Sequence, residues 1–152
     1  RLMQPDEREG VLAGIEKEYG AAPVRSSHRY MTEEELKDLA GSQYITIGGH
    51  TVTHSRLSML SREKQRDEIE GSVRCLEKIM NKKVATFSYP FGGREDYNAD
   101  SIAIVREMNL KTASNFPGRA YCNTSPYELP RMIVRNWDWT TFPVMFHPFW
   151  YY

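Results

Sequence analysis

The alternation of helix-like and strand-like segments is the feature that most limits how this chain can fold. Helical spacing of apolar residues predicts helices over residues 6–19, 33–40 and 62–80, and a further one through Ile102, Val105 and Met108. Short apolar runs predict strands at residues 44–47, 84–89, 110–114 and 132–134. Strands separated by helices pair in parallel through right-handed crossovers. The pattern therefore predicts an α/β fold, either a barrel or an open doubly wound sheet.

Capping residues support the boundaries of these helices. Thr32, followed three residues later by Glu35, forms a capping box, Ser61 can cap the long helix, and Asn98 or Asp100 can cap the next one. The last 17 residues hold 8 of the 18 aromatic residues of the chain. Such a density is more often buried than left in water, so we expect this tail to dock on the core.

Composition excludes several classes of protein. The chain has 152 residues, which is enough for about one domain, with 20 basic and 20 acidic residues. A net charge of zero argues against binding to nucleic acid or anionic lipid, and it favours neutral or weakly charged partners. No stretch approaches the ~20 apolar residues that span a bilayer. Cys75 and Cys122 form neither a CxxC pair nor a zinc-knuckle spacing.

Two histidines follow the first predicted strand directly. The segment Gly48-Gly49 leads into His50-Thr51-Val52-Thr53-His54, so two imidazoles stand four residues apart at the carboxyl end of a strand. That end is where α/β folds build active sites, and imidazole is the commonest metal-ligating side chain. On spacing alone, the pair can be metal ligands or two ordinary surface or capped histidines.

The order of the motifs adds to this pattern. A strand, the segment GGHTVTHxxLSxLS, a long amphipathic helix, a second strand and YPFGG follow one another. This order resembles the second and third motifs of the polysaccharide deacetylases, the NodB-homology enzymes of carbohydrate esterase family four. The segment His50–His54 matches the His-Ser/Thr-x-x-His metal motif, and Tyr89-Pro90-Phe91-Gly92 is similar to the third motif. Leu129-Pro130-Arg131 resembles a further segment, and the likeness covers about residues 30–135.

The resemblance implies a distorted, incomplete (β/α) barrel that removes N-acetyl groups from a GlcNAc-containing polysaccharide. A divalent metal, most often zinc, would be held by His50, His54 and an aspartate, and a metal-bound water would attack the acetamide carbonyl. A carboxylate base and a histidine acid complete such a site, and the backbone N–H of Phe91 would contact the oxyanion. Tyr89, Pro90 and Phe91 are expected at the substrate, although aromatic residues at this density, such as Tyr89, are more often core residues. Family membership also implies a secreted or cell-envelope protein.

The chain departs from the family pattern in its first motif. The two adjacent aspartates that supply the base and the third metal ligand occur nowhere in residues 1–152. We therefore expect a single deacetylase-like domain over residues 1–152, truncated at its N-terminal end, with the missing ligand and base upstream of Arg1. Ser88 also stands where many members have arginine.

The later motifs leave alternatives open. Asp138-Trp139 has the Asp-Trp of the fourth motif, but Arg135 stands where its earlier aspartate would be. His147 resembles the catalytic acid of the fifth motif, or it is a structural histidine in an aromatic cluster. Arg131 can orient carboxylates at the site or form a structural ion pair, and Trp139 can stack on a sugar or belong to the core.

Three hypotheses follow for the function. The first is a metal-dependent polysaccharide deacetylase. The second is a non-catalytic carbohydrate-binding or degenerate remnant, which the missing Asp-Asp pair and the aromatic tail favour. The third is a purely structural metal clip formed by the two histidines. The sequence leaves open the glycan, the metal and the oligomeric state.

Overall fold

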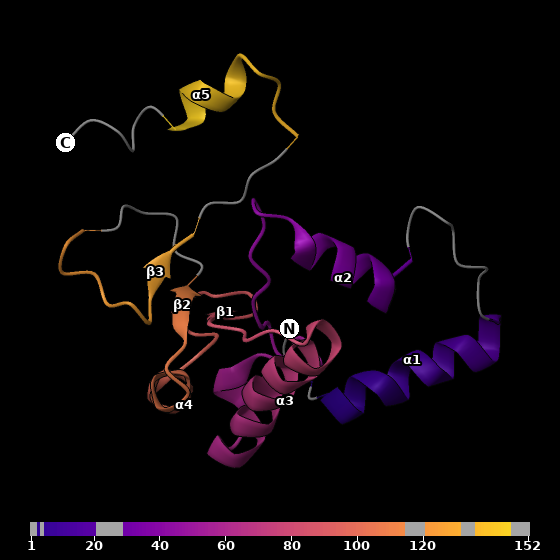
Figure 1. Ribbon diagram of the computed structural model, residues 1–152. Helices are drawn as coiled ribbons and strands as arrows, with labels where there is room; N and C mark the ends of the chain where they lie inside the picture. The colour runs from indigo at the N-terminus through magenta and orange to yellow at the C-terminus, as the bar shows by residue number, and fades with distance from the viewer. Residues whose placement is uncertain (1–2, 4, 21–28, 115–120, 132–135, 147–152) are drawn as a thin grey trace.

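The computed structural model describes residues 3, 5–20, 29–114, 121–131 and 136–146. The elements run in the order α1 (Pro5–Tyr19), α2 (Glu33–Gly41), the 3-10 helix η2 (Leu57–Met59), α3 (Arg62–Met80), β1 (Thr86–Ser88), α4 (Ala99–Glu107), β2 (Lys111–Ser114), β3 (Leu129–Pro130) and α5 (Thr141–Phe146). Figure 1 shows the three strands beside one another at the centre of the molecule.

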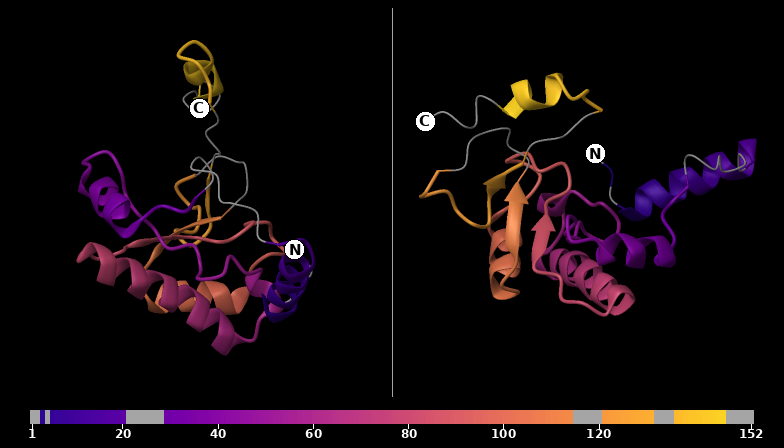
Figure 2. Two further views of the ribbon diagram at one scale, coloured as in Figure 1. Left: turned by 90° about the vertical axis from the view of Figure 1, so that its right-hand side faces the viewer. Right: turned by 45° about the horizontal axis from the view of Figure 1, so that its top comes forward.

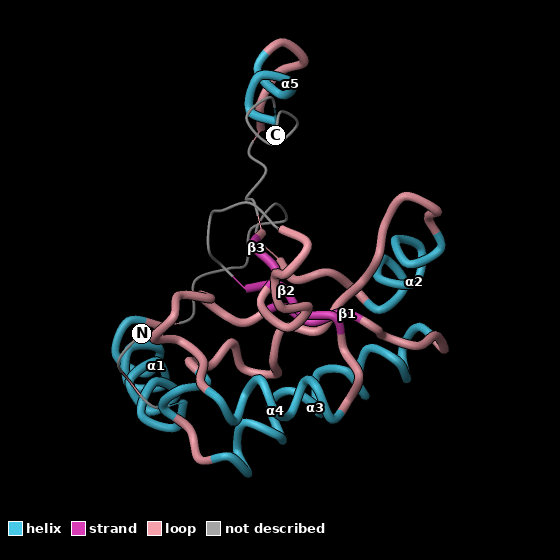
Figure 3. The backbone as a smooth tube through the Cα atoms, turned by 90° about the vertical axis from the view of Figure 1, so that its left-hand side faces the viewer, coloured by secondary structure: helices cyan, strands magenta, loops and turns pink. Residues whose placement is uncertain are grey.

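The three strands form one parallel sheet in the order β1-β2-β3. Phe87 pairs with Thr112, Ala113 pairs with Leu129, and Gly49 adds a single parallel bridge to Phe87 on the other edge. Helices α3 and α4 both cover the same face of this sheet (Figures 2 and 3). Neighbours in the sheet thus follow the order of the chain, whereas a doubly wound sheet reverses its order and carries helices on both faces.

The predicted α/β class with parallel strands is confirmed, and so are the four predicted helices. The capping box of Thr32 and Glu35 is present, and Ser61 and Asn98 cap α3 and α4. The predicted strands at 84–89 and 110–114 correspond to β1 and β2. Over the described residues the sheet is open and does not close into a barrel.

The strand predicted at residues 44–47 does not form. Within the part of the chain that the structure describes, backbone pairing with β1 begins only at Gly49, and the side chain of Tyr44 is 88% exposed. Apolar, β-branched residues there indicated a strand, but a strand also needs a neighbour that accepts its hydrogen bonds. The run predicted at 132–134 lies outside the described residues.

The expectation that the aromatic tail docks on the core is wrong for two of its residues, Trp139 and Phe142. Trp139 is 85% exposed and Phe142 is 44% exposed. Helix α5 lies apart from the sheet and its covering helices (Figure 1), and Phe142 makes a ring contact with Trp137 inside the same segment. A high density of aromatic residues therefore does not fix where a short segment packs.

The hydrophobic core lies between the sheet and helices α3 and α4. Alternation along β1 buries Phe87, while the side chains of Thr86 and Ser88 on the opposite face are half-buried. The apolar residues of this core are Leu57, Leu60, Ile69, Val73, Val84, Phe87, Tyr89, Tyr97, Ile104, Val105 and Leu110. The core thus includes residues from both deacetylase-like motifs and fixes the segments that carry them.

Helix α1 forms as predicted, but its apolar side chains are not part of this core. Val11, Leu12 and Ile15 each remain about half exposed. Helical periodicity is a local property, so it predicts the helix without specifying what packs against it. No helix in the described part of the chain is both long enough and apolar enough to cross a membrane.

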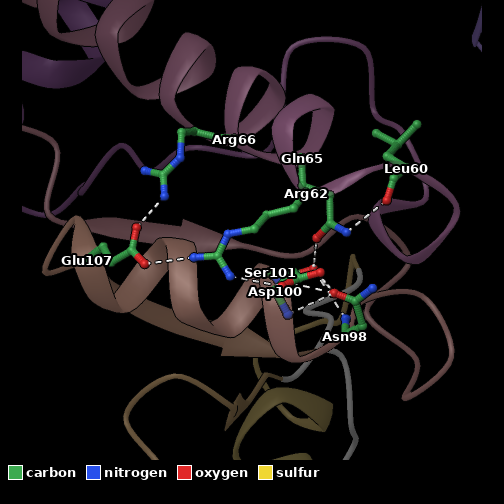
Figure 4. A network of polar contacts seen from close by, with 8 residues as sticks. All are labelled: Leu60, Arg62, Gln65, Arg66, Asn98, Asp100, Ser101 and Glu107. Atoms are coloured by element: carbon green, nitrogen blue, oxygen red, sulfur yellow. Dashed lines mark hydrogen bonds and ion pairs between the residues drawn. The ribbon is translucent and has the colours of Figure 1, made fainter.

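A buried polar bridge joins the first turns of α3 and α4 (Figure 4). The Gln65 side chain is fully buried, its Nε2 donates to the Leu60 carbonyl at 3.0 Å, and its Oε1 accepts from the Ser101 hydroxyl at 2.5 Å. Nearby, Arg62 pairs with Asp100 and Glu107 at the surface. The two connections differ in burial, so they are expected to differ in their contribution to stability.

We predict that Gln65→Ala lowers the free energy of unfolding by about 1 to 3 kcal/mol, because it leaves the Leu60 carbonyl buried without this partner. The Ser101 hydroxyl would lose its shortest hydrogen bond and, among the described residues, keep only its contacts with Asn98. The matched control is Arg62→Ala, whose half-exposed ion pairs should contribute less than about 1 kcal/mol. Urea unfolding followed by circular dichroism measures both. Equal losses in the two variants would contradict this difference.

We also predict that Gly49→Ala destabilises the fold by about 1 to 3 kcal/mol through overpacking. A Cβ atom at this position would lie 2.9 Å from Cδ2 of Phe87 and 3.0 Å from Cγ2 of Val73. Gly41→Ala is the control, since a Cβ there meets no atom within 4 Å and helical alanine is favoured over glycine. Thermal unfolding should show a lower midpoint for Gly49→Ala only.

Candidate metal centre

The backbone of Gly49 fixes where the two histidines leave the sheet. Its N–H donates to the Thr86 carbonyl at 2.9 Å, and its carbonyl accepts from the Ser88 N–H at 2.9 Å. These bonds place His50 beside the last residue of β1. The carboxyl ends of parallel strands are where ligands bind in α/β folds.

The two imidazoles lie against each other. The ring centroids of His50 and His54 are 4.8 Å apart in an edge-to-face arrangement with an interplanar angle of 71°. Nδ1 of His50 is 2.6 Å from the Ser88 carbonyl oxygen. A carbonyl only accepts, so Nδ1 carries the proton and the Nε2 lone pair is left for a ligand.

Electrostatics favour the neutral form of His50. Burial lowers the pKa of this imidazole below its ordinary value. The hydrogen bond to the Ser88 carbonyl opposes this shift, and the nearby His54 and Arg131 add to it, so that the pKa of His50 is lowered overall. The pKa of Arg131 is itself lowered by burial. A metal ligand has to be unprotonated, so this environment prepares His50 for coordination at neutral pH.

The segment between the histidines has an unusual backbone. Thr51 has φ of 66° and His54 has φ of 58°, in the left-handed region that favours glycine. Glu68, on α3, contacts this segment: its Oε2 accepts from the N–H groups of Val52 and Thr53 at 2.8 and 2.9 Å, and its Oε1 accepts from the Thr53 hydroxyl at 2.7 Å. Glu68 was not predicted as a site residue, because along the helix it resembles the other charged residues of α3.

The turn after β1 brings the third motif, Tyr89 to Gly92, to the histidines. The ring of Phe91 lies 4.8 Å from that of His54 in an edge-to-face contact at 79°. Phe91 and Gly92 both have positive φ, 58° and 74°. The two motifs, which are 37 residues apart at His54 and Phe91, therefore meet at one place in the fold.

Tyr89 and Pro90, predicted at the substrate, lie in the interior. Both side chains are fully buried. The Tyr89 ring stacks on Tyr97 with centroids 4.1 Å apart, and its hydroxyl donates to the Tyr127 carbonyl at 3.1 Å. Burial raises the pKa of this hydroxyl. A contact between this ring and a sugar requires solvent access that the structure does not give it.

An ion pair between the partly exposed Arg56 and the buried Asp96 connects the histidine segment to the turn after β1. Nε of Arg56 lies 3.1 Å from Oδ1 of Asp96, whose side chain is fully buried. The other carboxylate oxygen of Asp96 accepts from the Gly93 N–H at 2.9 Å. The Ser58 hydroxyl and the Arg56 guanidinium both donate to the Glu95 carbonyl. These bonds hold the two motif loops in a fixed relation.

The remaining predicted residues, Arg131, Asp138 and His147, have three different outcomes. Arg131 lies at the site, where its guanidinium donates to the Tyr89 carbonyl at 3.2 Å. Asp138 is exposed and accepts hydrogen bonds from the backbone and side chain of Thr140 and from the Thr141 N–H, which lower its pKa to about 2. Asp138 therefore caps the start of α5. His147 lies outside the described residues.

The donors present fit part of a metal site. Two imidazoles on one loop suit a divalent ion such as zinc, which usually takes at least three protein ligands. Within the described residues, no group of three or more histidine, cysteine, aspartate or glutamate side chains stands close enough to hold an ion. Two buried hydroxyls beside His50, those of Thr51 and Ser88, also have no hydrogen-bond partner among these residues. The described part thus supplies two ligands and a polar surrounding.

The sequence of this chain is similar to those of polysaccharide deacetylases. The profile described as polysaccharide deacetylase matches residues 15–113, more than half of the chain. The Bacillus subtilis (strain 168) protein YxkH, whose name assigns it to the polysaccharide deacetylases, is 26% identical over 106 residues, which are 69% of this chain and 37% of YxkH. The chain therefore spans well under half the length of that relative.

Solved structures are also similar. The Streptococcus pyogenes deacetylase PplD, in complex with acetate, is 26% identical with a TM-score of 0.62, covering 81% of this chain and 50% of PplD. BA3943 of Bacillus anthracis, a CE4 family pseudoenzyme, is 24% identical with a TM-score of 0.47 over 53% of this chain and 27% of its own. From the profile match over residues 15–113, the chain belongs to the polysaccharide deacetylase family.

Proposed function

We propose that this chain is part of a metal-dependent hydrolase that removes N-acetyl groups from a GlcNAc-containing polysaccharide. The observation that carries this proposal is the contact of His50, His54 and Phe91, which unites two motifs of the family in one centre. Membership of the deacetylase family supports the same reaction class. The similarity to PplD, a deacetylase in complex with acetate, also supports it.

In this proposal His50 and His54 hold a divalent ion, and zinc is the ion that the family resemblance favours. The ion would supply Lewis acidity, which polarises an acetamide carbonyl and makes water more acidic. The Ser88 carbonyl holds the proton on Nδ1 of His50, so Nε2 would be the ligand atom. Phe91 would donate its backbone N–H to the oxygen on which negative charge develops.

The remaining parts of the catalytic machinery are proposed from the resemblance. A third ligand and a carboxylate base would come from residues beyond the described part of the chain. His147 would protonate the leaving amine as the general acid, and Pro90 would shape the turn that carries the Phe91 N–H. Arg131 would hold this turn through the Tyr89 carbonyl.

We propose a distorted (β/α) barrel for the complete fold of this single domain. The strands follow one another in chain order, and both covering helices lie on one face, as in a singly wound barrel. Thr86 and Ser88 present hydroxyls to the opposite face, which would then be the interior. A polymeric substrate outside the cytoplasm would require a secreted or cell-envelope location, and this location is part of the proposal.

A non-catalytic carbohydrate-binding role is the second candidate function. The observation that favours it is the incomplete ligand set, because the described residues bring together only two metal-binding side chains. A protein of this kind would bind glycan without the ion. The two functions therefore differ in their response to a chelator.

We predict that the chain binds Zn²⁺ or Co²⁺ through its histidines, and that His54→Ala weakens the affinity by at least about tenfold, because one of two imidazole ligands is lost. Val52→Ala is the matched control, since its side chain is 62% exposed and its N–H contact to Glu68 is a backbone one. Calorimetric titration measures the affinities. Equal affinities of His54→Ala and the wild type would contradict the assignment of the ligands.

We predict that acetate release from N-acetylated oligosaccharides depends on added metal and falls more than about a hundredfold in His50→Ala, because the carbonyl is no longer polarised. The natural full-length protein is the sample, and the measurement is an acetate assay with and without chelator. Glycan binding that persists in chelator, without any acetate release, would instead support the carbohydrate-binding alternative.

A further inference from the structure

We infer that Glu68 is a positioning residue for the metal centre: its carboxylate holds the loop between His50 and His54 in the shape that presents both imidazoles. This role rests on the function proposed above, because a positioning residue needs ligands to position. Glu68 lies on α3, outside both sequence motifs, and 14 residues after His54.

The contacts of Glu68 fall on the middle of the loop. Its Oε2 accepts from two successive N–H groups, those of Val52 and Thr53, at 2.8 and 2.9 Å. Its Oε1 accepts from the Thr53 hydroxyl at 2.7 Å. Hydrogen bonds to an ionised carboxylate are stronger than those between neutral groups, and two successive N–H groups that converge on one oxygen form an anion-binding nest.

These bonds lie between the two strained positions of the loop. Thr51 and His54 are both in the left-handed region, which disfavours side chains with a Cβ atom. A threonine adopts that conformation only where surrounding contacts enforce it. The N–H groups of Val52 and Thr53 can converge on Glu68 only in this loop shape, so the carboxylate selects it over extended alternatives.

Glu68 is itself held firmly by its helix. The next residue, Ile69, is fully buried in the core, and Gln65, one turn earlier, is fixed by its buried bonds to Leu60 and Ser101. The Arg8 guanidinium, from α1, also donates to the loop, at the Thr53 carbonyl, over 3.2 Å. Glu68 therefore connects the loop to the core, and it is not itself one of the apolar residues that form the core.

The test compares Glu68→Ala and Glu68→Gln with Glu63→Ala, an exposed glutamate in the first turn of the same helix. Zn²⁺ affinity of the 152-residue chain is measured by competition with a chromophoric chelator. Glu68→Ala should lower the affinity about 10- to 100-fold, as loss of a residue that orients metal ligands does. Glu68→Gln should fall between, because its amide keeps one acceptor oxygen, and Glu63→Ala should match the wild type.

A second readout needs no metal. Long-range proton–nitrogen NMR spectra of the histidine rings report which nitrogen carries the proton. The wild type should show the Nδ1 proton on His50 that the Ser88 carbonyl requires, and Glu68→Ala should show a mixture of tautomers with an unchanged circular dichroism spectrum. Wild-type spectra and wild-type Zn²⁺ affinity in Glu68→Ala would overturn the positioning role, as would equal weakening in Glu63→Ala.

The two readouts separate this role from the proposed function. If the wild-type chain binds no Zn²⁺ while Glu68→Ala still disturbs the His50 tautomer, then the metal centre is wrong and the control of the loop by Glu68 stands. If the wild type binds Zn²⁺ and Glu68→Ala binds it equally well, then the metal centre stands and the positioning role of Glu68 is wrong.

Discussion

The close backbone approach of Gly49 to β1 is the constraint on which the rest of the site depends. Two hydrogen bonds of 2.9 Å join Gly49 to Thr86 and Ser88, and any Cβ atom at Gly49 would meet the core side chains of Phe87 and Val73. A residue without a side chain is therefore required at this point. The same approach brings His50 within hydrogen-bond reach of the Ser88 carbonyl, which sets its tautomer. The tautomer of His50 thus depends in part on the packing of one glycine.

Two different kinds of interaction then hold the two motif loops at the end of the sheet: an ion pair and a set of hydrogen bonds. The Asp96 carboxylate is fully buried, so loss of Arg56 would leave an uncompensated charge in a medium of low dielectric constant. Glu68 is a half-buried residue of α3, and it holds the loop between the histidines through hydrogen bonds to Val52 and Thr53. The ion pair fixes the distance between the two motifs, and the hydrogen bonds of Glu68 fix the shape of the histidine loop. Orientation of ligands requires both.

Sequence reasoning succeeds here where the determinants are local. Apolar spacing and caps such as Ser61 predict the helices, because both act within one turn. The histidine pair and the Phe91 turn are also found from short motifs. The same reasoning misses Glu68 and Asp96, because their partners lie far away in the sequence and periodicity carries no information about them. It also overpredicts the strand at 44–47, since strand formation depends on a neighbour that the segment cannot specify.

The residues with a strained backbone are concentrated in the two motif loops. Among the described residues, five non-glycine residues have positive φ. Two of them, Asn81 and Asn109, stand just beyond the ends of α3 and α4, where asparagine adopts this conformation at little cost. The other three are Thr51, His54 and Phe91, and all three lie in the two motif loops. The left-handed conformation is unfavourable for threonine, histidine and phenylalanine. These three residues therefore need contacts with the surrounding structure that outweigh the strain.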